Sequence, residues 1–415
     1  MDTGIIVIGN EVLSGETLDT NSQFLGKELN LIGLSVKKKI SIPDERECIF
    51  NSINEIFKVV DTVIVSGGLG PTNDDITKKT LTEYFNTKLR FDEKVFEDVK
   101  NILKHRIKKI TKYHKDQALI PEKAIALTNK YGTAPGLLFE ENGKILISLP
   151  GIPFELKALM TNEVVPFLKT KIKNVALINK NIRTIAISES RIAEIIKDIE
   201  DNLETNLSMA YLPSLAQVKI RLTAKGENYF LLEKQINNVI EKIKQRIGEY
   251  IFGYDEITIP EAIGKLLLEK NAMLGVAESC TGGNISHQIT LIPGSSQYFK
   301  GAVIAYSNEV KMSKLSVPKK TLIDYGAVSQ QTAEAMAQGI IENLNTDFSI
   351  ATTGIAGPDG GTDDKAVGTV WIAVASKNIV VSKKIFHAKG RLQNIQYSTI
   401  IALDMLRRLM RGEGR

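Results

Sequence analysis

The segment AESCTGG, residues 277–283, places a hydroxyl, a thiol and a second hydroxyl directly before two glycines. It follows a short apolar run and precedes a helical pattern, so Ser279 and Cys280 are expected at the N-terminal end of a helix. A side chain of this kind acts as a nucleophile only when a neighbouring group activates it. The first question is therefore which of these side chains is the nucleophile.

Cys280 has one physical argument in its favour, because a thiol at a helix N-terminus has a depressed pKa and is intrinsically nucleophilic. A Cys280–His287 pair is excluded in a continuous helix, since seven residues span about 10 Å. A buried cysteine is also often only a small apolar residue. These arguments leave Cys280 as a minority alternative, and they do not by themselves choose between the hydroxyls of Ser279 and Thr281.

A second candidate site lies in the first half of the chain, in the run GGLGPTNDDIT at residues 67–77. Glycines after a strand let backbone N–H groups approach an anion, and a following helix N-terminus favours negative charge. Asp74 and Asp75 have a structural alternative, because carboxylates in a first turn also complement the helix dipole.

Alternating strands and helices surround this run. Apolar strands are predicted at residues 3–9, 35–40, 61–66 and 144–149, with helices between them. This order favours a mainly parallel, doubly wound α/β sheet within residues 1–170, in which ligands gather at the carboxyl ends of the strands.

Two further segments follow. Residues 171–252 predict a small α+β module, and residues 253–255 look like a linker. Residues 258–415 predict a second α/β domain that contains AESCTGG.

Composition narrows the class of protein. A chain of 415 residues suggests two or three domains. Its net charge of +5 is mild, and its lysine runs at 37–39 and 100–115 are interpreted as solvated surface rather than a nucleic-acid site. Its two cysteines, Cys48 and Cys280, imply no disulfide framework. No stretch approaches the ~20 apolar residues of a membrane span, and the N-terminus lacks a leader pattern, so we expect a cytoplasmic protein.

The first domain resembles a known fold over several motifs. GNEVLSGETLDTNSQFL, GGLGPTNDDIT, GTAPG and LPGIPFEL resemble the molybdopterin-binding fold of MoaB, MogA and MoeA, and more closely the N-terminal domain of the CinA family. The resemblance implies hydrolysis of ADP-ribose to AMP and ribose 5-phosphate with a divalent metal (Mg, Mn or Co), and a monovalent cation as a further candidate.

This resemblance assigns roles in the first domain. Asp44 and Asp75 are expected nearest the reaction and as the metal ligands, since paired carboxylates suit a hard cation that bridges a diphosphate. The residues expected to hold phosphate or line the same pocket are Gly67, Gly68, Gly70, Thr72, Glu11, Asp19 and Asn21.

The middle module stands where CinA proteins carry a KH-like insert. An RNA-binding KH domain needs a GXXG loop, and none occurs between residues 171 and 250. A spacer or dimer-forming role is therefore favoured, and nucleic acid is not expected as a partner.

The third segment resembles the C-terminal domain of CinA proteins. AESCTGG, GAVIAYSNEVK, YGAVSQQTAEAMAQG and TTGIAGPDGGTDDKAVGTVWIA carry the likeness, which extends to the bacterial nicotinamide-nucleotide amidohydrolases (PncC). Those enzymes convert nicotinamide mononucleotide to nicotinate mononucleotide and ammonia, and no cofactor is expected for this activity.

The resemblance makes Ser279 the nucleophile and Lys311 its base, and Tyr306 is expected to relay a proton or orient the serine. A lysine base needs its pKa lowered from about 10.4 by desolvation or nearby positive charge, which a strand end beside a closed pocket could provide. The remaining expected contacts to substrate are the backbone N–H groups of Thr281 and Gly282 for the oxyanion, Thr353 and Gly354 for ribose or phosphate, and Arg391 for phosphate.

The sequence thus favours a bifunctional hydrolase acting on nicotinamide mononucleotide and ADP-ribose, with a homodimer expected from the family. One alternative is a catalytically weak nucleotide-binding protein in competence or DNA repair, with a recombination protein as a candidate partner. A molybdopterin-binding protein is a further alternative, suggested by the first domain alone.

Overall fold

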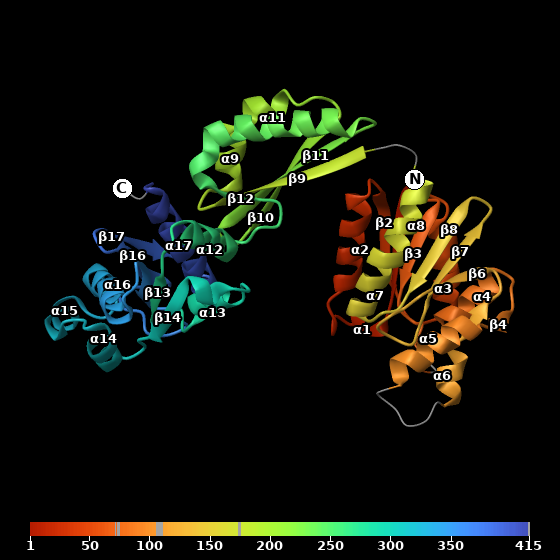
Figure 1. Ribbon diagram of the computed structural model, residues 1–415, viewed down its shortest axis with the longest axis horizontal. Coiled ribbons are helices and arrows are strands. Elements are labelled where there is room, and N and C mark those ends of the chain that lie inside the picture. Colours follow the sequence, from red (N-terminus) through yellow and green to blue (C-terminus); the bar gives the residue numbers. More distant parts are fainter. Residues whose placement is uncertain (71, 73–74, 105–110, 173–175, 414–415) are drawn as a thin grey trace. The chain divides into compact units, whose positions relative to one another are not determined.

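The computed structural model describes residues 1–70, 72, 75–104, 111–172 and 176–413. The chain divides into two compact units (Figure 1). The first comprises Met1–Ile178 and Lys225–Leu232, and the second comprises Asn179–Ala224 and Glu233–Arg415.

The N-terminal sheet has the strand order β2-β1-β3-β8-β7-β6. Its parallel strands are β1 (Asp2–Ile8), β2 (Ser35–Ile42), β3 (Thr62–Ser66) and β8 (Lys144–Leu149), and its antiparallel edge is formed by β7 (Gly136–Glu141) and β6 (Ala124–Leu127). The mainly parallel sheet expected from the sequence is therefore present, with an antiparallel extension that the sequence pattern did not indicate.

Helices cover both faces of this sheet (Figure 1). One face packs against α2 (Thr20–Leu31), α7 (Pro153–Leu159), the π-helix η1 (Met160–Val164) and α8 (Val165–Lys171). The other packs against α3 (Arg46–Ile56), α4 (Thr77–Tyr84) and α5 (Glu93–Leu103). Strand β1 is buried on both sides, because Ile5 and Val7 enter the first core and Ile6 and Ile8 the second.

Short elements complete this domain. They are α1 (Asn10–Leu13), α6 (Lys112–Asp116) and a two-stranded sheet of β4 (Leu89–Phe91) and β5 (Leu119–Pro121). Helix α2 begins where the sequence predicted, since the Asp19 carboxylate accepts a hydrogen bond from the Ser22 N–H at 2.9 Å. Of the lysine-rich segment 100–115, residues 105–110 lie outside the described part.

The middle module is a four-stranded sheet in the order β10-β11-β9-β12 with helices packed on it. Its elements are β9 (Ala176–Ile185), α9 (Glu189–Ile195), α10 (Lys197–Asp201), β10 (Leu207–Ser214), β11 (Gln217–Gly226), α11 (Tyr229–Ile247), the 3₁₀ turn η2 (Gly248–Tyr250) and β12 (Ile251–Tyr254). The predicted linker at residues 253–255 is wrong in part, because β12 pairs with β9 through Gly253 and Tyr254. Its neighbour Phe252 is buried in the C-terminal core, which fixes this strand in place.

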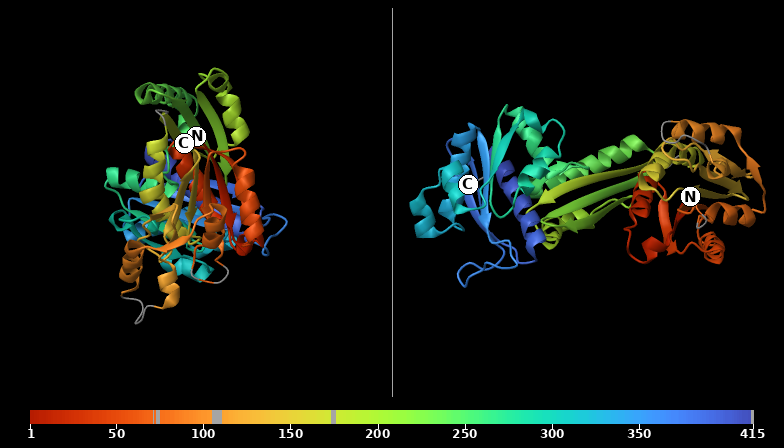
Figure 2. Two further views of the ribbon diagram at one scale, coloured as in Figure 1. Left: turned by 90° about the vertical axis from the view of Figure 1, so that its right-hand side faces the viewer. Right: turned by 90° about the horizontal axis from the view of Figure 1, so that it is seen from below.

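The C-terminal sheet has the order β14-β13-β15-β16-β17. Strands β13 (Leu274–Glu278), β14 (Phe299–Ile304) and β15 (Phe348–Gly354) are parallel, and β16 (Thr369–Ser376) and β17 (Val380–Phe386) are antiparallel. One face carries α12 (Ile259–Glu269), α13 (Asn284–Thr290) and α17 (Arg391–Arg411), and the 3₁₀ turn η3 (Ser295–Gln297) precedes β14. The other face carries α14 (Asn308–Leu315), α15 (Lys319–Tyr325) and α16 (Gln330–Leu344), so the sheet lies between two helical layers (Figure 2).

Candidate active site

Ser279 lies directly after β13, at the carboxyl end of the parallel strands. Its N–H donates to the Thr352 carbonyl on β15 at 3.0 Å, and the residue is 8% exposed. Gly282 and Gly283 have φ values of +60° and +98°, a conformation that favours glycine and turns the chain into α13. The glycines of AESCTGG therefore set the turn that presents the serine hydroxyl.

Lys311 lies against this hydroxyl. Its Nζ atom is 3.2 Å from Ser279 Oγ, 2.8 Å from the Ala305 carbonyl oxygen and 3.3 Å from the Tyr306 carbonyl oxygen. The sequence placed Lys311 at a strand end, but the residue lies on α14, whose N-terminus Ser307 caps. One turn of helix carries the amine back under the end of β14, and Lys311 is only 1% exposed.

Burial lowers the pKa of Lys311 from the ordinary 10.5, and the neighbouring Cys280 opposes this shift. Lys311 makes no ion pair with a carboxylate in the part of the chain that the structure describes. A neutral amine has two hydrogens and one lone pair. As an ammonium group, Lys311 donates to all three oxygens. In its neutral form, an amine that donates its two hydrogens to the carbonyls turns its lone pair to the Ser279 hydroxyl and can accept its proton.

Glu278 fixes the turn from beneath, a role that sequence reasoning missed. Its carboxylate is fully buried and accepts hydrogen bonds from the N–H groups of Gly283, Ile285 and Ser286, and from the Ser286 hydroxyl, at 2.6 to 3.1 Å. The N-terminal donors of α13 are thereby satisfied by a carboxylate. A glutamate at a strand end just before a glycine turn and a helix is the sequence signal that could have found it.

The expected oxyanion donors differ in their availability. The Gly282 N–H donates to the Ser279 carbonyl at 3.1 Å, so it closes the turn and does not point to a substrate, contrary to the expectation. The N–H groups of Cys280 and Thr281 have no acceptor outside their own residues among the described residues. These two donors are therefore free for an oxyanion.

Cys280 does not have the environment of a reactive thiol. It is 6% exposed and belongs to the hydrophobic core of the domain. Burial raises its pKa to about 12, which keeps the sulfur protonated at neutral pH. The helix N-terminus does not lower the pKa of this thiol enough to offset the effect of burial. The structure therefore favours Ser279 over Cys280 as the nucleophile.

Arg391 and Tyr306 lie at the exposed rim of this site. Arg391 Nη2 donates to the Tyr306 hydroxyl at 3.2 Å, and Nη1 donates to the Gly357 carbonyl at 2.7 Å. Thr353 is buried, and its hydroxyl donates to the Ala327 carbonyl at 2.7 Å, so this group supports the loop. Gly354 is the last residue of β15, where a Cβ would collide with Val370 and the Thr369 carbonyl oxygen.

The second candidate site is at the strand ends of the N-terminal sheet. Gly67 and Gly68 follow β3 with φ values of +115° and +68°, and side chains there would collide with the Ile8 carbonyl and with Thr77. Asn21 bridges two strand ends, since its Nδ2 donates to Ser66 Oγ at 3.1 Å and to the Gly151 carbonyl at 2.7 Å. Its buried Oδ1 atom has no partner within the described residues.

The two carboxylates expected to bind metal follow β2 and β3, which flank β1. An Asp44 oxygen accepts from the Asn10 N–H at 3.3 Å. An Asp75 oxygen accepts from the Thr72 N–H at 3.0 Å and from its hydroxyl, and Gly70 leaves the space for this carboxylate. Asp74 lies outside the described residues.

These oxygens suit a hard divalent cation. No group of three or more His, Cys, Asp or Glu side chains that could enclose an ion occurs within the described residues. The residues therefore fit a cation only if substrate oxygens complete its coordination, which is the usual arrangement for magnesium at phosphates.

Other predicted residues of this pocket have structural partners. The Asp19 carboxylate forms an ion pair with Lys39 at 2.7 Å and caps α2. Burial opposes ionisation of Asp19, but hydrogen bonds from Lys39 and Ser22 hold its pKa below the usual value. Glu11 is exposed on α1, next to the strand end at Gly9.

Three residues near these strand ends were missed from the sequence. Asn129 donates to Glu155 at 2.7 Å, and both are buried, which ties the loop before β7 to the start of α7. Lys78 on α4 donates to the Asp116 carbonyl at 2.8 Å, and burial lowers its pKa to about 8 although Asp116 and Asp75 oppose this shift. No sequence spacing marks Asn129, Glu155 or Lys78 as a residue of this site.

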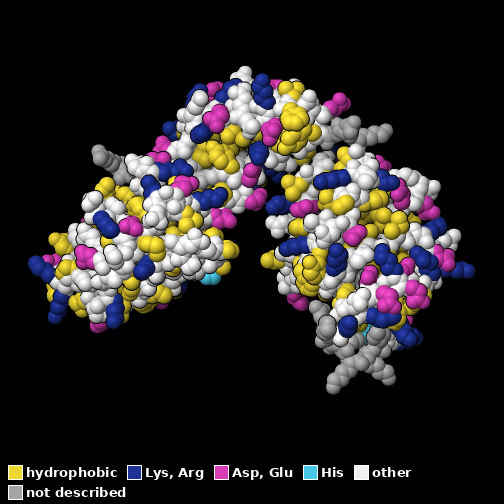
Figure 3. All heavy atoms as spheres, viewed as in Figure 1, with side chains coloured by type: hydrophobic (Ala, Val, Ile, Leu, Met, Phe, Trp, Pro, Cys, Tyr) yellow, Lys and Arg dark blue, Asp and Glu magenta, His cyan; other side chains and the backbone are white. Residues whose placement is uncertain are grey.

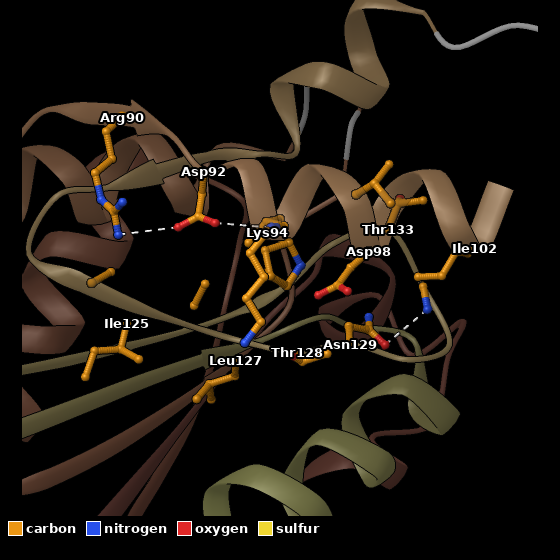
Figure 4. A pocket seen from close by; sticks show the side chains of 16 residues that line it. Arg90, Asp92, Lys94, Asp98, Ile102, Ile125, Leu127, Thr128, Asn129 and Thr133 are labelled. Carbon is orange, nitrogen blue, oxygen red and sulfur yellow. Dashed lines mark hydrogen bonds and ion pairs between the residues drawn. The ribbon is translucent and has the colours of Figure 1, made fainter. Parts of the chain in front are cut away.

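A hollow of about 240 Å³ lies beside the edge strand β6, under α5 (Figure 4). Lys94 and Asp98 on α5 face Thr128 and Asn129 across it, and Arg90 pairs with Asp92 at 3.4 Å at its rim. No site residue expected from the sequence lines this hollow.

Surface charge is mixed. On the face shown in Figure 3, basic and acidic side chains are interspersed over both units. No helix among the described residues is both long and apolar enough to cross a bilayer.

Three family models match the chain in succession. Residues 4–170 match a probable molybdopterin binding domain, residues 179–253 match the damage-inducible protein CinA KH domain, and residues 256–410 match the CinA C-terminal domain. The chain therefore has a molybdopterin-binding-like N-terminal domain, a KH-like middle domain and a C-terminal CinA α/β domain, which confirms the fold class expected from the sequence.

Two curated relatives match over nearly the whole chain, and a solved structure matches part of it. A CinA-like protein of Flavobacterium psychrophilum is 42% identical over 98% of this chain and 98% of its own length. A CinA-like protein of Cytophaga hutchinsonii is 40% identical over 98% of this chain and 97% of its own length. A crystal structure of a competence/damage inducible protein from Agrobacterium tumefaciens is 35% identical, covering 37% of this chain and 96% of that chain with a TM-score of 0.35.

Proposed function

Since the chain belongs to the CinA family, we propose that its C-terminal domain hydrolyses the carboxamide of nicotinamide mononucleotide to nicotinate mononucleotide and ammonia. The observation that carries this proposal is the 3.2 Å contact between Ser279 Oγ and a buried Lys311 amine without a carboxylate partner in the described part of the chain. A hydroxyl beside an amine of lowered pKa is an activated nucleophile.

In the proposed reaction, Ser279 Oγ attacks the carboxamide carbon and its proton moves to Lys311 Nζ. The N–H groups of Cys280 and Thr281 stabilise the resulting oxyanion. Lys311 then returns the proton to the leaving nitrogen, which departs as ammonia and leaves an ester on Ser279. Lys311 next takes a proton from water as the water attacks the ester. It then gives that proton to the departing Ser279 oxygen, and the released acid loses its proton to solvent to become the carboxylate product.

Arg391 is the proposed partner of the substrate phosphate. It is exposed at the rim of the site, and a guanidinium binds phosphate through two parallel hydrogen bonds. Its bond to the Tyr306 hydroxyl links it to the segment whose backbone carbonyl holds Lys311. Phosphate recognition at the rim thus orients the pyridine ring toward Ser279.

The test is chromatography of the products formed from nicotinamide mononucleotide by the full chain and by Ser279→Ala. The variant should release no ammonia, because it keeps the site but lacks the attacking oxygen. Ser296→Ala, at an exposed serine before β14, is the matched control and should retain full turnover. Undiminished ammonia release by Ser279→Ala would overturn the proposal.

For the N-terminal domain we propose metal-dependent hydrolysis of ADP-ribose to AMP and ribose 5-phosphate. Asp44 and Asp75 would hold the cation, which when bound would neutralise charge on the diphosphate. Backbone N–H groups of the Gly67–Gly70 turn would bind phosphate. Asn21, whose buried oxygen has no partner among the described residues, would contact the sugar or water. The family likeness and this set of oxygens at the strand ends support the assignment.

The second test follows AMP formation from ADP-ribose with Mg, Mn or Co. Asp75→Asn should abolish it, since the amide keeps the shape but loses the charge. Asp61→Asn, at an exposed carboxylate before β3, should have no effect. Absence of AMP with all three metals would contradict this assignment and favour a nucleotide-binding role.

The proposal assigns both activities to a homodimer in the cytoplasm. Cys48 and Cys280 are both free thiols, as is usual in a reducing compartment.

A further inference from the structure

A second hollow, of about 380 Å³, lies within the C-terminal unit, between the middle module and the α/β domain. The turn between β10 and β11 forms one wall, and the others are formed by the first turn of α12, by Asn284 and Gln288 of α13, and by side chains within residues 396–403 of α17. Ile185 and Phe252 of the middle module are buried in the core of the α/β domain, so the two walls are held together by packing.

The polar lining of this hollow has unused hydrogen-bonding capacity. The side chains of Arg183, Gln217, Gln288 and Gln396 form no hydrogen bond or ion pair with any described residue. Arg183 only approaches the Phe252 ring, at 6.0 Å from the centroid. A guanidinium and three carboxamides therefore converge on one space without protein partners.

The hollow also favours an anion with an apolar part. No Asp or Glu is among the described residues that line it, so the charge of Arg183 is not compensated there. Apolar side chains form the rest of the lining, including Ile259, Pro260 and Leu403. A volume of this size lies within the range of small-molecule sites.

We propose that this hollow binds a mononucleotide. The phosphate pairs with Arg183, since a guanidinium matches phosphate geometry. The base lies against Ile259 and Pro260, and the glutamine amides, which both donate and accept, pair with its edge. This site is distinct from both proposed catalytic sites, because none of their residues lines it.

The hollow lies next to two helices that border the candidate active site. Helix α13 begins at the turn that carries Ser279, and α17 begins at Arg391. Asn284 and Thr399, which both line the hollow, join the two helices through a hydrogen bond of 2.8 Å. A nucleotide held there contacts both helices that border the candidate active site.

The test is hydrogen exchange of the full chain with AMP, adenosine or inorganic phosphate, followed by mass spectrometry of peptides that cover residues 210–218 and 396–403. AMP should protect both segments saturably, and adenosine or phosphate alone should protect them far less. A nucleotide in either catalytic site does not contact the β10–β11 turn, so protection of residues 210–218 reports this hollow.

Arg183→Ala should raise the AMP concentration for half-protection about tenfold or more, because one charge-assisted phosphate contact is lost. Gln396→Leu, at an exposed position on α17, should weaken protection without disturbing the module, and Arg221→Ala on the exposed side of β11 should change nothing. No protection by AMP, equal protection by phosphate alone, or unchanged protection in both Arg183→Ala and Gln396→Leu would overturn the proposal.

Discussion

Replacing Lys311 by methionine removes the proposed base while keeping most of the side-chain volume. General-base catalysis contributes about 10²–10⁴-fold, so kcat/KM for ammonia release should fall by that factor, or ~3–5 kcal/mol of transition-state stabilisation. The Ser279 hydroxyl stays in place because its position depends on the β13 strand end and the glycine turn, not on the amine.

The same substitution should leave the domain folded. The Ala305 and Tyr306 carbonyls lose a donor, which costs about 1–3 kcal/mol for a buried group. Removal of a desolvated amine offsets part of this cost, because methionine is suited to an apolar site. Thermal unfolding should therefore show a shift of a few degrees and no loss of cooperativity.

The assay is initial-rate ammonia release at saturating and subsaturating nicotinamide mononucleotide. Lys314→Met changes an exposed lysine one turn along the same helix and should keep the activity of the unmodified protein. If Lys311→Met retains activity within a factor of three of Lys314→Met, the lysine is not the base and the reasoning from its burial is refuted.

Further predictions concern the same site. Activity should rise with pH as Lys311 loses its proton, with the midpoint below 10.5 because burial lowers its pKa; a pH–rate profile that shows no such limb would contradict the neutral amine. Between the lowered pKa of Lys311 and 10.5, the folded state binds fewer protons than the unfolded state. The contribution of Lys311 to the free energy of unfolding should therefore increase with pH over that window. Denaturant unfolding of Lys311→Met and of the unmodified protein measures this contribution. Glu278→Gln should destabilise the fold by about 1.5–3 kcal/mol and lower kcat, because an amide cannot accept all four bonds from α13; unchanged melting and turnover would remove its positioning role. Iodoacetamide at neutral pH should reach Cys280 only after unfolding, and rapid labelling of Cys280 in the native protein would support the thiol as the nucleophile.

Sequence reasoning succeeded where a local pattern determines the structure. The apolar strands β3 and β13 end in glycine turns that require a backbone conformation few other residues adopt, so both candidate sites were found at strand ends. The long motifs that follow these strands also identified the family.

It failed where a contact depends on tertiary packing. Between α4 and β8, strands β4, β5 and β6 are only three or four residues long, which is too short for a clear alternating pattern. The sequence predicted that Lys311 lies at a strand end. The motif alone does not show that a helix begins before Lys311, or that its first turn brings the Lys311 amine to Ser279. Glu278 appeared to be an ordinary strand residue because its partners lie five to eight residues further on.

Capture of the covalent intermediate tests the central claim most directly. The protein is mixed with nicotinamide mononucleotide, denatured with acid during the first turnover and digested, and the modified peptide is sequenced by mass spectrometry. We predict a nicotinate mononucleotide ester on Ser279 that is absent from Ser279→Ala. A thioester on Cys280, or steady ammonia release with an unmodified Ser279, would contradict the account.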